Sequence, residues 1–322
     1  MRKLAFLVAG LIGVSGGVAH AENYPSRPIQ LIVPYAPGGI TDVAARMVVQ
    51  RLEKELGQTI VVENRAGAAT TVASNYVARQ KPDGYTLYAA SVSLPLNKYL
   101  QSNVQYDAFE DFTVLSGFTD SPFVLQVSKK LGVSSMEELL KKMKENPGKY
   151  TIGASGVGAM NHIATETWLK QSGAEGLVVQ YQGGAQVRMA MLGGDIDMTF
   201  ATLNEAKPLL DEGTSLPIAV TTQERVPSLP DVPTFNEAMK VENFEVIFWT
   251  ALVAPKGLPD DRAEVLRKAM KAVGEDEELR QKLAAQGVIL NVTDAEQTIQ
   301  RMRNAVETFA PIIQDFQQAQ KK

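Results

Sequence analysis

The sequence contains no cysteine. This absence excludes disulfide bonds, a thiolate nucleophile, cysteine-ligated zinc and a lipid-modified cysteine as a membrane tether. Histidine is almost as scarce, with only His20 and His162 in the chain. A histidine-rich metal site is therefore excluded by number alone. His20 would leave with a cleaved signal peptide, and the one remaining histidine, His162, excludes more than one histidine-dependent catalytic centre.

The chain also lacks a strong charge of either sign. It carries 32 Lys and Arg against 36 Asp and Glu, a net charge of −4. Nucleic-acid binding calls for a basic face, which this balance does not provide. After Val18 no apolar run approaches the roughly 20 residues that span a bilayer. At 322 residues the chain is long enough to divide its core between two lobes.

A cleavable signal peptide is predicted at residues 1–21. Arg2 and Lys3 precede an uncharged run over residues 4–18, which is too short for a membrane anchor. Ala19 and Ala21 then place small residues at the two positions that a signal peptidase recognises. We therefore expect export to the periplasm, with cleavage after Ala21 and free diffusion of the mature protein.

Strand-like and helix-like segments alternate along the rest of the chain, which predicts an α/β fold with largely parallel sheets. Helices are expected at residues 41–56, 68–79 and 297–322, and after a capping box that opens at Ser135. Strands are expected at residues 28–35, 59–62, 85–90, 150–153, 177–180, 197–200, 216–220 and 288–292.

Two longer extended segments, residues 113–127 and 244–254, are long enough to pass between lobes. Their spacing predicts lobe 1 from residues 22–121 and 249–322, with lobe 2 (122–248) inserted into it. The two segments would then form a two-strand hinge, with a ligand bound between the lobes.

The first candidate site is the segment Y-A-P-G-G-I-T-D at residues 35–42. Its glycines let backbone N–H groups approach a ligand, and the helix that follows adds unpaired N–H groups and a positive dipole end. An anion can bind there without a lysine. A simple strand-to-helix turn explains the pattern equally well. Asp42 is assigned a structural role, because its carboxylate would repel an anion.

The second candidate, G-A-S-G-V-G-A-M-N-H, occupies residues 153–162. A nucleophile elbow needs glycine where Val157 stands, and a dinucleotide fingerprint needs glycine where Asn161 stands, so both enzymatic patterns fail. An anion cradle with Ser155 and Asn161 as donors fits better. His162 is either a ligand donor or a structural hydrogen-bonding residue.

Another glycine-bearing strand-to-helix junction, Y-Q-G-G-A, occupies residues 181–185. Asp195 and Asp197 precede a strand and suggest a divalent metal. Two carboxylates without a third nearby are more often turn and strand residues, so no metal and no cofactor is expected. The C-terminal amphipathic helix is assigned to lobe packing.

Five motifs in order resemble the substrate-binding proteins of tripartite tricarboxylate transporters, the TctC or Bug family. They are V-P-Y-A-P-G-G-I-T-D, V-V-E-N-R-A-G, K-P-D-G-Y-T-L, G-A-S-G-V-G and L-P-D-V-P-T-F-N-E-A, and the resemblance runs from Tyr24 to about Ala310. It implies a type II periplasmic binding fold, in which two Rossmann-like lobes trap a ligand on closure.

The resemblance further implies a small carboxylate ligand, either a di- or tricarboxylate or an aromatic acid, and a membrane permease of a large and a small subunit. A monomer without catalytic activity is expected. The ligand-holding residues implied here are Tyr35, Gly39, Ile40, Thr41, Ser91, Ser93, Ser155, Met160, Asn161, His162, Gly183 and Gly184.

This sequence departs from the family pattern at positions that bear on ligand identity. Ala66-Gly67-Ala68-Ala69-Thr70 stands where the family often has P-G-A-G-G, and Ala201 replaces a frequent acidic residue. The loss of that carboxylate argues against an amino-acid ligand, while Met160 favours an apolar or aromatic one. Two alternatives stay open: a sensor protein that signals to a kinase, and an exported hydrolase that uses Ser155.

Overall fold

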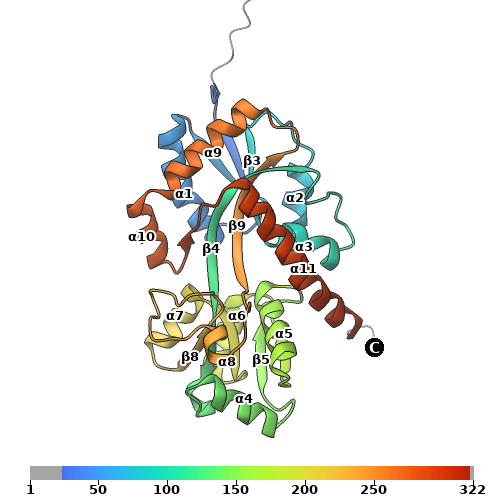
Figure 1. Cartoon of the computed structure of the whole chain (residues 1–322), viewed down its shortest axis with the longest axis vertical. Helices are drawn as coiled ribbons and strands as arrows, with labels where there is room; N and C mark the ends of the chain where they lie inside the picture. Colours follow the sequence, from blue (N-terminus) through green and yellow to red (C-terminus); the bar gives the residue numbers. More distant parts are fainter. Residues whose placement is uncertain (1–23, 320–322) are drawn as a thin grey trace, which may run out of the picture.

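The computed structural model describes residues 24–319, and the predicted signal peptide lies outside them. Two lobes are stacked along the long axis of the molecule (Figure 1). Two strands, β4 (Phe112–Ser128) and β9 (Ile247–Pro255), run from one lobe to the other. None of the helices in this range has both the length and the apolar character needed to cross a bilayer.

Lobe 1 is built around three short strands, and lobe 2 around four. The strands of lobe 1 are β1 (Ile29–Val33), β2 (Ile60–Asn64) and β3 (Thr86–Ser91), and those of lobe 2 are β5 (Thr151–Ala154), β6 (Leu177–Gln180), β7 (Met198–Thr202) and β8 (Ser215–Val220). A two-residue strand, β10 (Ile289–Leu290), pairs with β4.

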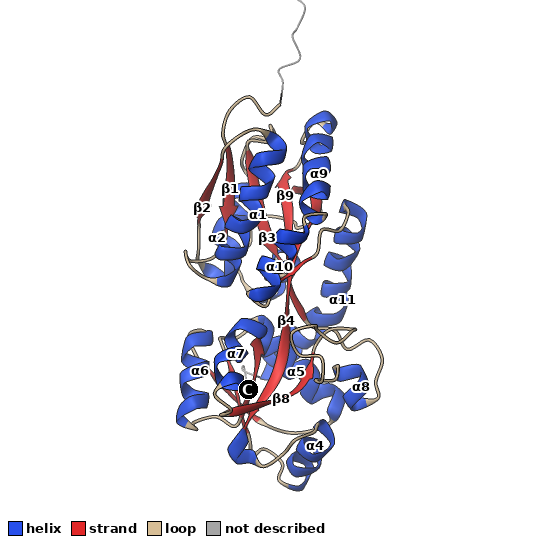
Figure 2. Cartoon of the chain, turned by 90° about the vertical axis from the view of Figure 1, so that its left-hand side faces the viewer, coloured by secondary structure: helices blue, strands red, loops and turns tan. Residues whose placement is uncertain are grey.

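Helices cover the strands in both lobes (Figure 2). Lobe 1 carries α1 (Ile40–Leu56), α2 (Thr71–Val77), α3 (Ser93–Leu100), α9 (Asp260–Gly274) and α10 (Glu277–Ala285). Lobe 2 carries α4 (Met136–Glu145), α5 (Met160–Ser172), α6 (Gly184–Gly193), α7 (Leu203–Asp211) and α8 (Phe235–Met239). The last helix, α11 (Ala295–Ala319), packs against α3, β4 and α5.

The predicted strands are present, with ends shifted by a few residues, but the expectation of largely parallel sheets is wrong. The strand order is β2-β1-β3-β9-β4-β7-β5-β6. The short strands pair in parallel within each lobe, whereas every pairing made by β4 or β9 is antiparallel. The chain enters lobe 2 through β4 and returns through β9, so these two strands must run in opposite directions.

β4 changes its partners halfway along its length. Its first half pairs with β9, from Phe112 opposite Pro255 to Pro122 opposite Ile247. From Phe123 onward it pairs with β7 and β8 instead. The pairing of β4 with β9 has two register shifts, after Val114 and after Gly117, but neither falls at the predicted boundary. The exact limits of the two lobes, at 121/122 and 248/249, therefore stay a prediction.

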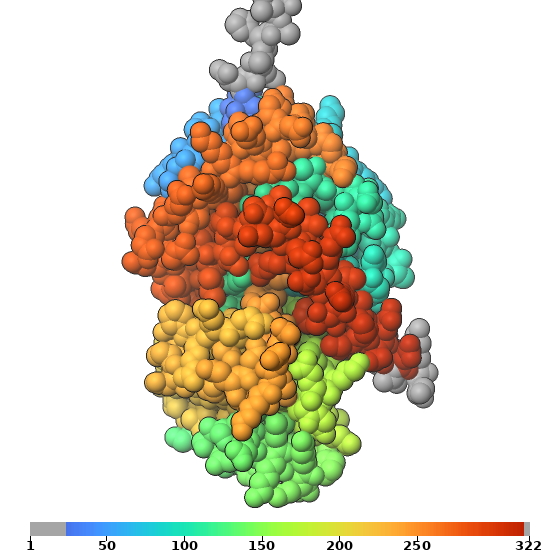
Figure 3. Space-filling view, viewed as in Figure 1, coloured from blue at the N-terminus to red at the C-terminus, as the bar shows by residue number. Residues whose placement is uncertain are grey.

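Helix α11 lies across the boundary between the lobes, and in the space-filling view it reaches from lobe 1 to α5 (Figure 3). Its apolar face contributes Met302, Phe309 and Phe316 to the largest hydrophobic cluster. The assignment of this helix to lobe packing is therefore confirmed.

An ion pair between Arg301 and Asp120 links α11 to β4. Arg301 donates to both carboxylate oxygens of Asp120 at 2.9 Å, and the Asn291 amide donates to the same carboxylate. Burial raises the pKa of the Asp120 carboxyl, and the charge of Arg301 and the hydrogen bond from Asn291 oppose this rise. The side chain of Asp120 is only 7% exposed, so its charge depends on Arg301 for compensation.

We expect Arg301→Ala to lower the free energy of unfolding by about 3–5 kcal/mol, because it leaves a buried carboxylate without its cation. Urea denaturation measures the effect. Lys170→Ala is the matched control, since the pair of Lys170 with Asp315 is well exposed and should contribute about 0–1 kcal/mol. Equal effects of the two substitutions would contradict the role given to Arg301.

Candidate functional site

A cavity of about 670 Å³ lies between the lobes. Both lobes and both crossing strands contribute to its wall. The lining residues are Tyr35, Ala36, Gly39, Ile40, Thr41, Ala69, Thr70, Ser93, Leu100, Phe123, Ser155, Gly156, Val157, Gly158, Ala159, Met160, Asn161, Gln182, Gly183, Thr202, Glu205 and Phe248. The first turns of α1 and α5 reach this cavity, as do Gln182 and Gly183, the two residues just before α6.

The turn that leads into α1 is held in place from outside the cavity. Helix α1 begins at Ile40, and its N-cap is Gly39 rather than the expected Thr41 or Asp42. Asp42 instead accepts hydrogen bonds from the Gly38 N–H, the Arg46 guanidinium and the Asn64 amide. The structural role assigned to Asp42 is confirmed, and the first N–H groups of α1 stay available to the cavity.

Tyr35 and Phe248 line the cavity side by side. The two rings meet edge to face with their centroids 5.7 Å apart. Burial raises the pKa of the Tyr35 phenol to about 12, so the hydroxyl is neutral. It lies 2.9 Å from the Ser91 hydroxyl, and Ser91 is fully buried behind it. Ser91 therefore orients Tyr35, while Ser93 lines the cavity itself.

On the opposite wall, the loop before α5 is organised by two side chains of that helix. The Asn161 amide oxygen accepts hydrogen bonds from the Ser155 N–H and hydroxyl. His162 Nδ1 accepts from the Gly158 N–H, its ring packs against Phe316 of α11, and the residue is 3% exposed. His162 does not line the cavity, which favours the structural interpretation over the ligand-donor one.

A third part of the cavity wall is formed by residues at the starts of α6 and α7. Gly183 lines the cavity and is the N-cap of α6. Glu205, in the first turn of α7, also lines it, and one of its oxygens accepts from the Thr202 N–H and hydroxyl. Sequence reasoning missed Glu205, although its place three residues after a threonine N-cap was a recognisable capping-box signal.

Nine of the twelve predicted site residues line the cavity. They are Tyr35, Gly39, Ile40, Thr41, Ser93, Ser155, Met160, Asn161 and Gly183. The other three, Ser91, His162 and Gly184, lie outside the lining set. Ala201 lies outside the lining set too, whereas Glu205, four residues later, brings a carboxylate to the cavity.

The segment before α2 reaches the cavity in an uncommon conformation. Residues 68–79 were expected to be helical, but Ala68, Ala69 and Thr70 have positive φ angles of 44°, 48° and 77°. Left-handed backbone is unfavourable for residues with a Cβ, and most unusual for β-branched Thr. The Asn97 amide donates to the Thr70 hydroxyl and helps to hold this turn.

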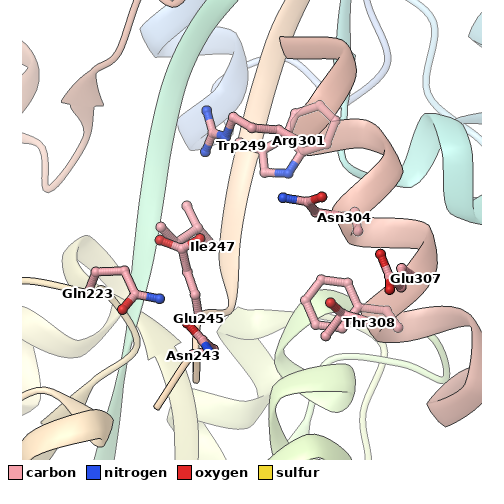
Figure 4. Close-up of a pocket in the computed structure, with 11 residues that line it drawn as sticks. Gln223, Asn243, Glu245, Ile247, Trp249, Arg301, Asn304, Glu307 and Thr308 are labelled. Atoms are coloured by element: carbon pink, nitrogen blue, oxygen red, sulfur yellow. The ribbon is translucent and has the colours of Figure 1, made fainter. Parts of the chain in front are cut away.

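A second cavity, of about 300 Å³, lies on the other face of β9. Successive side chains of a strand point to opposite faces, so Phe248 reaches the first cavity while Ile247 and Trp249 reach the second. Figure 4 shows Arg301 and Asn304 of α11 on one side of this space, with Ile247 on the other.

Asp197, one of the two carboxylates considered for a metal, has a structural role. Asp197 accepts hydrogen bonds from the N–H and hydroxyl of Thr151 and so joins β5 to the start of β7. Among the residues that the structure describes, no group of three or more metal-ligating side chains occurs.

A family model described as the tripartite tricarboxylate transporter family receptor, TctC, matches residues 44–317. The chain belongs to this family. BugT of Bordetella pertussis is 30% identical over 313 residues, which cover 96% of each chain. The resemblance stated from the sequence motifs is therefore confirmed.

Solved structures of TctC-type proteins share the two-lobed α/β fold. R. palustris Rpa4515, solved with adipate, is 29% identical with a TM-score of 0.79, over 91% of this chain and 98% of that one. MatC from Rhodopseudomonas palustris, solved with bound malate, is 26% identical with a TM-score of 0.74, over 90% of this chain and 100% of that one.

We expect Asp42→Asn to lower the free energy of unfolding at pH 7 by about 1.5–3 kcal/mol, the contribution of hydrogen bonds to a charged group. Burial acts to raise the pKa of Asp42, but the bonds from Arg46, Gly38 and Asn64 outweigh it and leave the pKa below its usual value. The stabilisation is therefore complete above the unfolded-state pKa of about 3.9. It is lost as the pH falls through the folded-state value.

Denaturation of wild type and variant across pH 2–7 measures this difference, which should shrink steadily below pH 4. A difference that stays constant with pH would show that the charge of Asp42 contributes nothing.

We also expect Ala69→Gly to stabilise the protein. A left-handed residue with a Cβ costs about 1–2 kcal/mol, and the greater freedom of glycine in the unfolded chain offsets about 0.5–1 kcal/mol of the gain. A net rise of roughly 0.5–1 kcal/mol should appear in thermal and urea unfolding. Ala73→Gly, within α2, is the control and should destabilise.

Proposed function

We propose that this protein is a periplasmic solute-binding protein that captures a small carboxylate between its lobes and delivers it to a membrane permease. The observation that carries the proposal is the inter-lobe cavity, which is lined by the first turns of α1 and α5 and by the N-cap of α6. Membership of the TctC family supports it, as do the adipate and malate bound by the two relatives.

The ligand carboxylate is held by backbone N–H groups and hydroxyls. No Lys, Arg or His is found among the described residues that line the cavity. Thr41 and Ser93 offer hydroxyl groups, Asn161 offers its amide N–H groups while Ser155 holds its oxygen, and the helix starts offer N–H groups and the positive ends of their dipoles. Three or four charge-assisted hydrogen bonds, at about 1.5–3 kcal/mol each, suffice for micromolar binding after ordering costs.

Ligand capture works as a shift of population between open and closed forms. A ligand that touches both lobes binds the closed form better and so favours it. The lobes already meet at the edge of the cavity, where a Cβ on Gly158 of lobe 2 would come within 2.5 Å of Leu100 of lobe 1. Closure then presents a surface that a partner can distinguish from the open form.

The geometry around Ser155 favours binding over hydrolysis. Its hydroxyl donates to the amide oxygen of Asn161, a group that is not a general base at neutral pH. The Nδ1 of His162 accepts a hydrogen bond from the Gly158 N–H, and its ring packs against Phe316. An activated nucleophile needs a base within hydrogen-bond reach, and neither residue supplies one here.

The partner is a permease made of a large and a small membrane subunit, and the protein acts as a monomer in the periplasm. The predicted signal peptide and the receptor description of the TctC family support this location and partner. A sensor that signals to a kinase would use the same closure. Genes for the two permease subunits beside this gene would favour transport over sensing.

The proposal is tested by calorimetry of the purified mature protein against adipate, malate, citrate, nicotinate and terephthalate. Saturable binding of at least one of them, with the ligand recovered unchanged, is the expected result. Turnover of a test ester or amide would identify a hydrolase instead.

Two variants test the site itself. Gly39→Leu should weaken binding more than tenfold, because it fills the cavity at a residue whose φ of −70° accepts any side chain. Ser155→Ala should weaken binding roughly fivefold to tenfold, the loss of about 1 kcal/mol. Ser172→Ala, at the far end of α5, is the control. Wild-type affinity in both site variants would place the ligand elsewhere.

A further inference from the structure

The wall formed by α6 and α7 holds a carboxylate that faces the ligand cavity. Glu205 is the one charged side chain among the described residues that line it. Its Oε2 accepts hydrogen bonds from the Thr202 N–H at 3.2 Å and the Thr202 hydroxyl at 2.7 Å. Its Oε1 accepts no hydrogen bond from the described residues and lies against Gly184 at the start of α6.

The neighbouring glycine shows how closely this carboxylate is fitted to α6. A Cβ on Gly184 would come within 2.2 Å of Oε1 and 3.0 Å of the carboxyl carbon of Glu205. Gly184 was predicted as a ligand contact, but it lies outside the lining set. It makes room for Glu205, whose negative charge thereby lies beside the positive end of the α6 dipole.

The three helix starts are therefore not equivalent toward an anion. The start of α6 already has a protein carboxylate beside it. Helix α5 has no acidic residue in its first turn, and Asp42 in α1 is paired with Arg46. An incoming carboxylate is favoured at α1 and α5 and repelled at Glu205.

We infer that Glu205 selects the ligand: it accepts a hydrogen bond from a protonated amine and disfavours a second carboxylate at this end of the cavity. The ligand class is then a monocarboxylate with an amine at its other end. Its body is apolar, because Leu100, Phe123 and Met160 line the space between these walls. This inference rests on the proposed function and narrows it.

The test compares probes that differ only at one end. The pairs are 6-aminohexanoate with adipate, and 4-(aminomethyl)benzoate with terephthalate. Calorimetry of the wild-type protein should give at least tenfold tighter binding of the amine member in one of the pairs. In Glu205→Gln this preference should fall at least tenfold, by weaker binding of the amine and tighter binding of the dicarboxylate.

Glu205→Gln is expected to fold, because glutamine also serves at this position of a capping box. Gly184→Ala should also reduce the preference for the amine. The added methyl group displaces the Glu205 carboxylate but leaves its charge in the protein. Glu264→Gln, on the exposed face of α9, is the control and should leave both affinities unchanged.

The outcomes separate this inference from the proposed function. Tighter binding of the dicarboxylate members, with a ratio that Glu205→Gln does not change, overturns the role of Glu205 but leaves carboxylate capture standing. Failure of every carboxylate to bind the wild-type protein contradicts the proposed function, and the inference with it.

Discussion

The antiparallel pairing of β4 with β9 is the constraint on which the arrangement of this protein depends. Both strands pass between the lobes, and their register runs from Phe112 opposite Pro255 to Pro122 opposite Ile247. Because side chains alternate along β9, Phe248 faces the ligand cavity while Ile247 and Trp249 face the opposite side. The same strand therefore joins the lobes, forms part of the cavity wall and separates the cavity from α11.

The chemistry of the cavity comes mainly from backbone rather than from charged side chains. Three helices begin at its wall, and two of the residues that hold their starting turns point away from it: Asp42 toward Arg46 and Asn64, and His162 toward α11. Fixed N–H groups in a partly enclosed site bind an anion without the cost of burying a lysine or arginine. Glu205 is the one charged side chain among the described residues that line this cavity, and for that reason we propose that it selects the ligand.

Much of the local structure could be predicted from sequence, because the signals are local. Gly57 ends α1 in a left-handed conformation, and Ser135 accepts a hydrogen bond at the start of α4, both at the expected positions. The segment at residues 68–70 could not be predicted this way. Its left-handed alanines and threonine oppose local preference and are held by contacts such as that of Asn97 with Thr70.

The sequence by itself determined the strand and helix order, the glycine-bearing turns and the family, since each of these depends on residues close together in the chain. Only the tertiary structure decided which turns meet and which side chains face the cavity. Ser91 and His162 were predicted as ligand contacts yet lie outside the cavity lining, while Glu205, which was not predicted, lines it. That outcome depends on side-chain direction and on packing between α6, α7 and the crossing strands, which join residues distant in sequence.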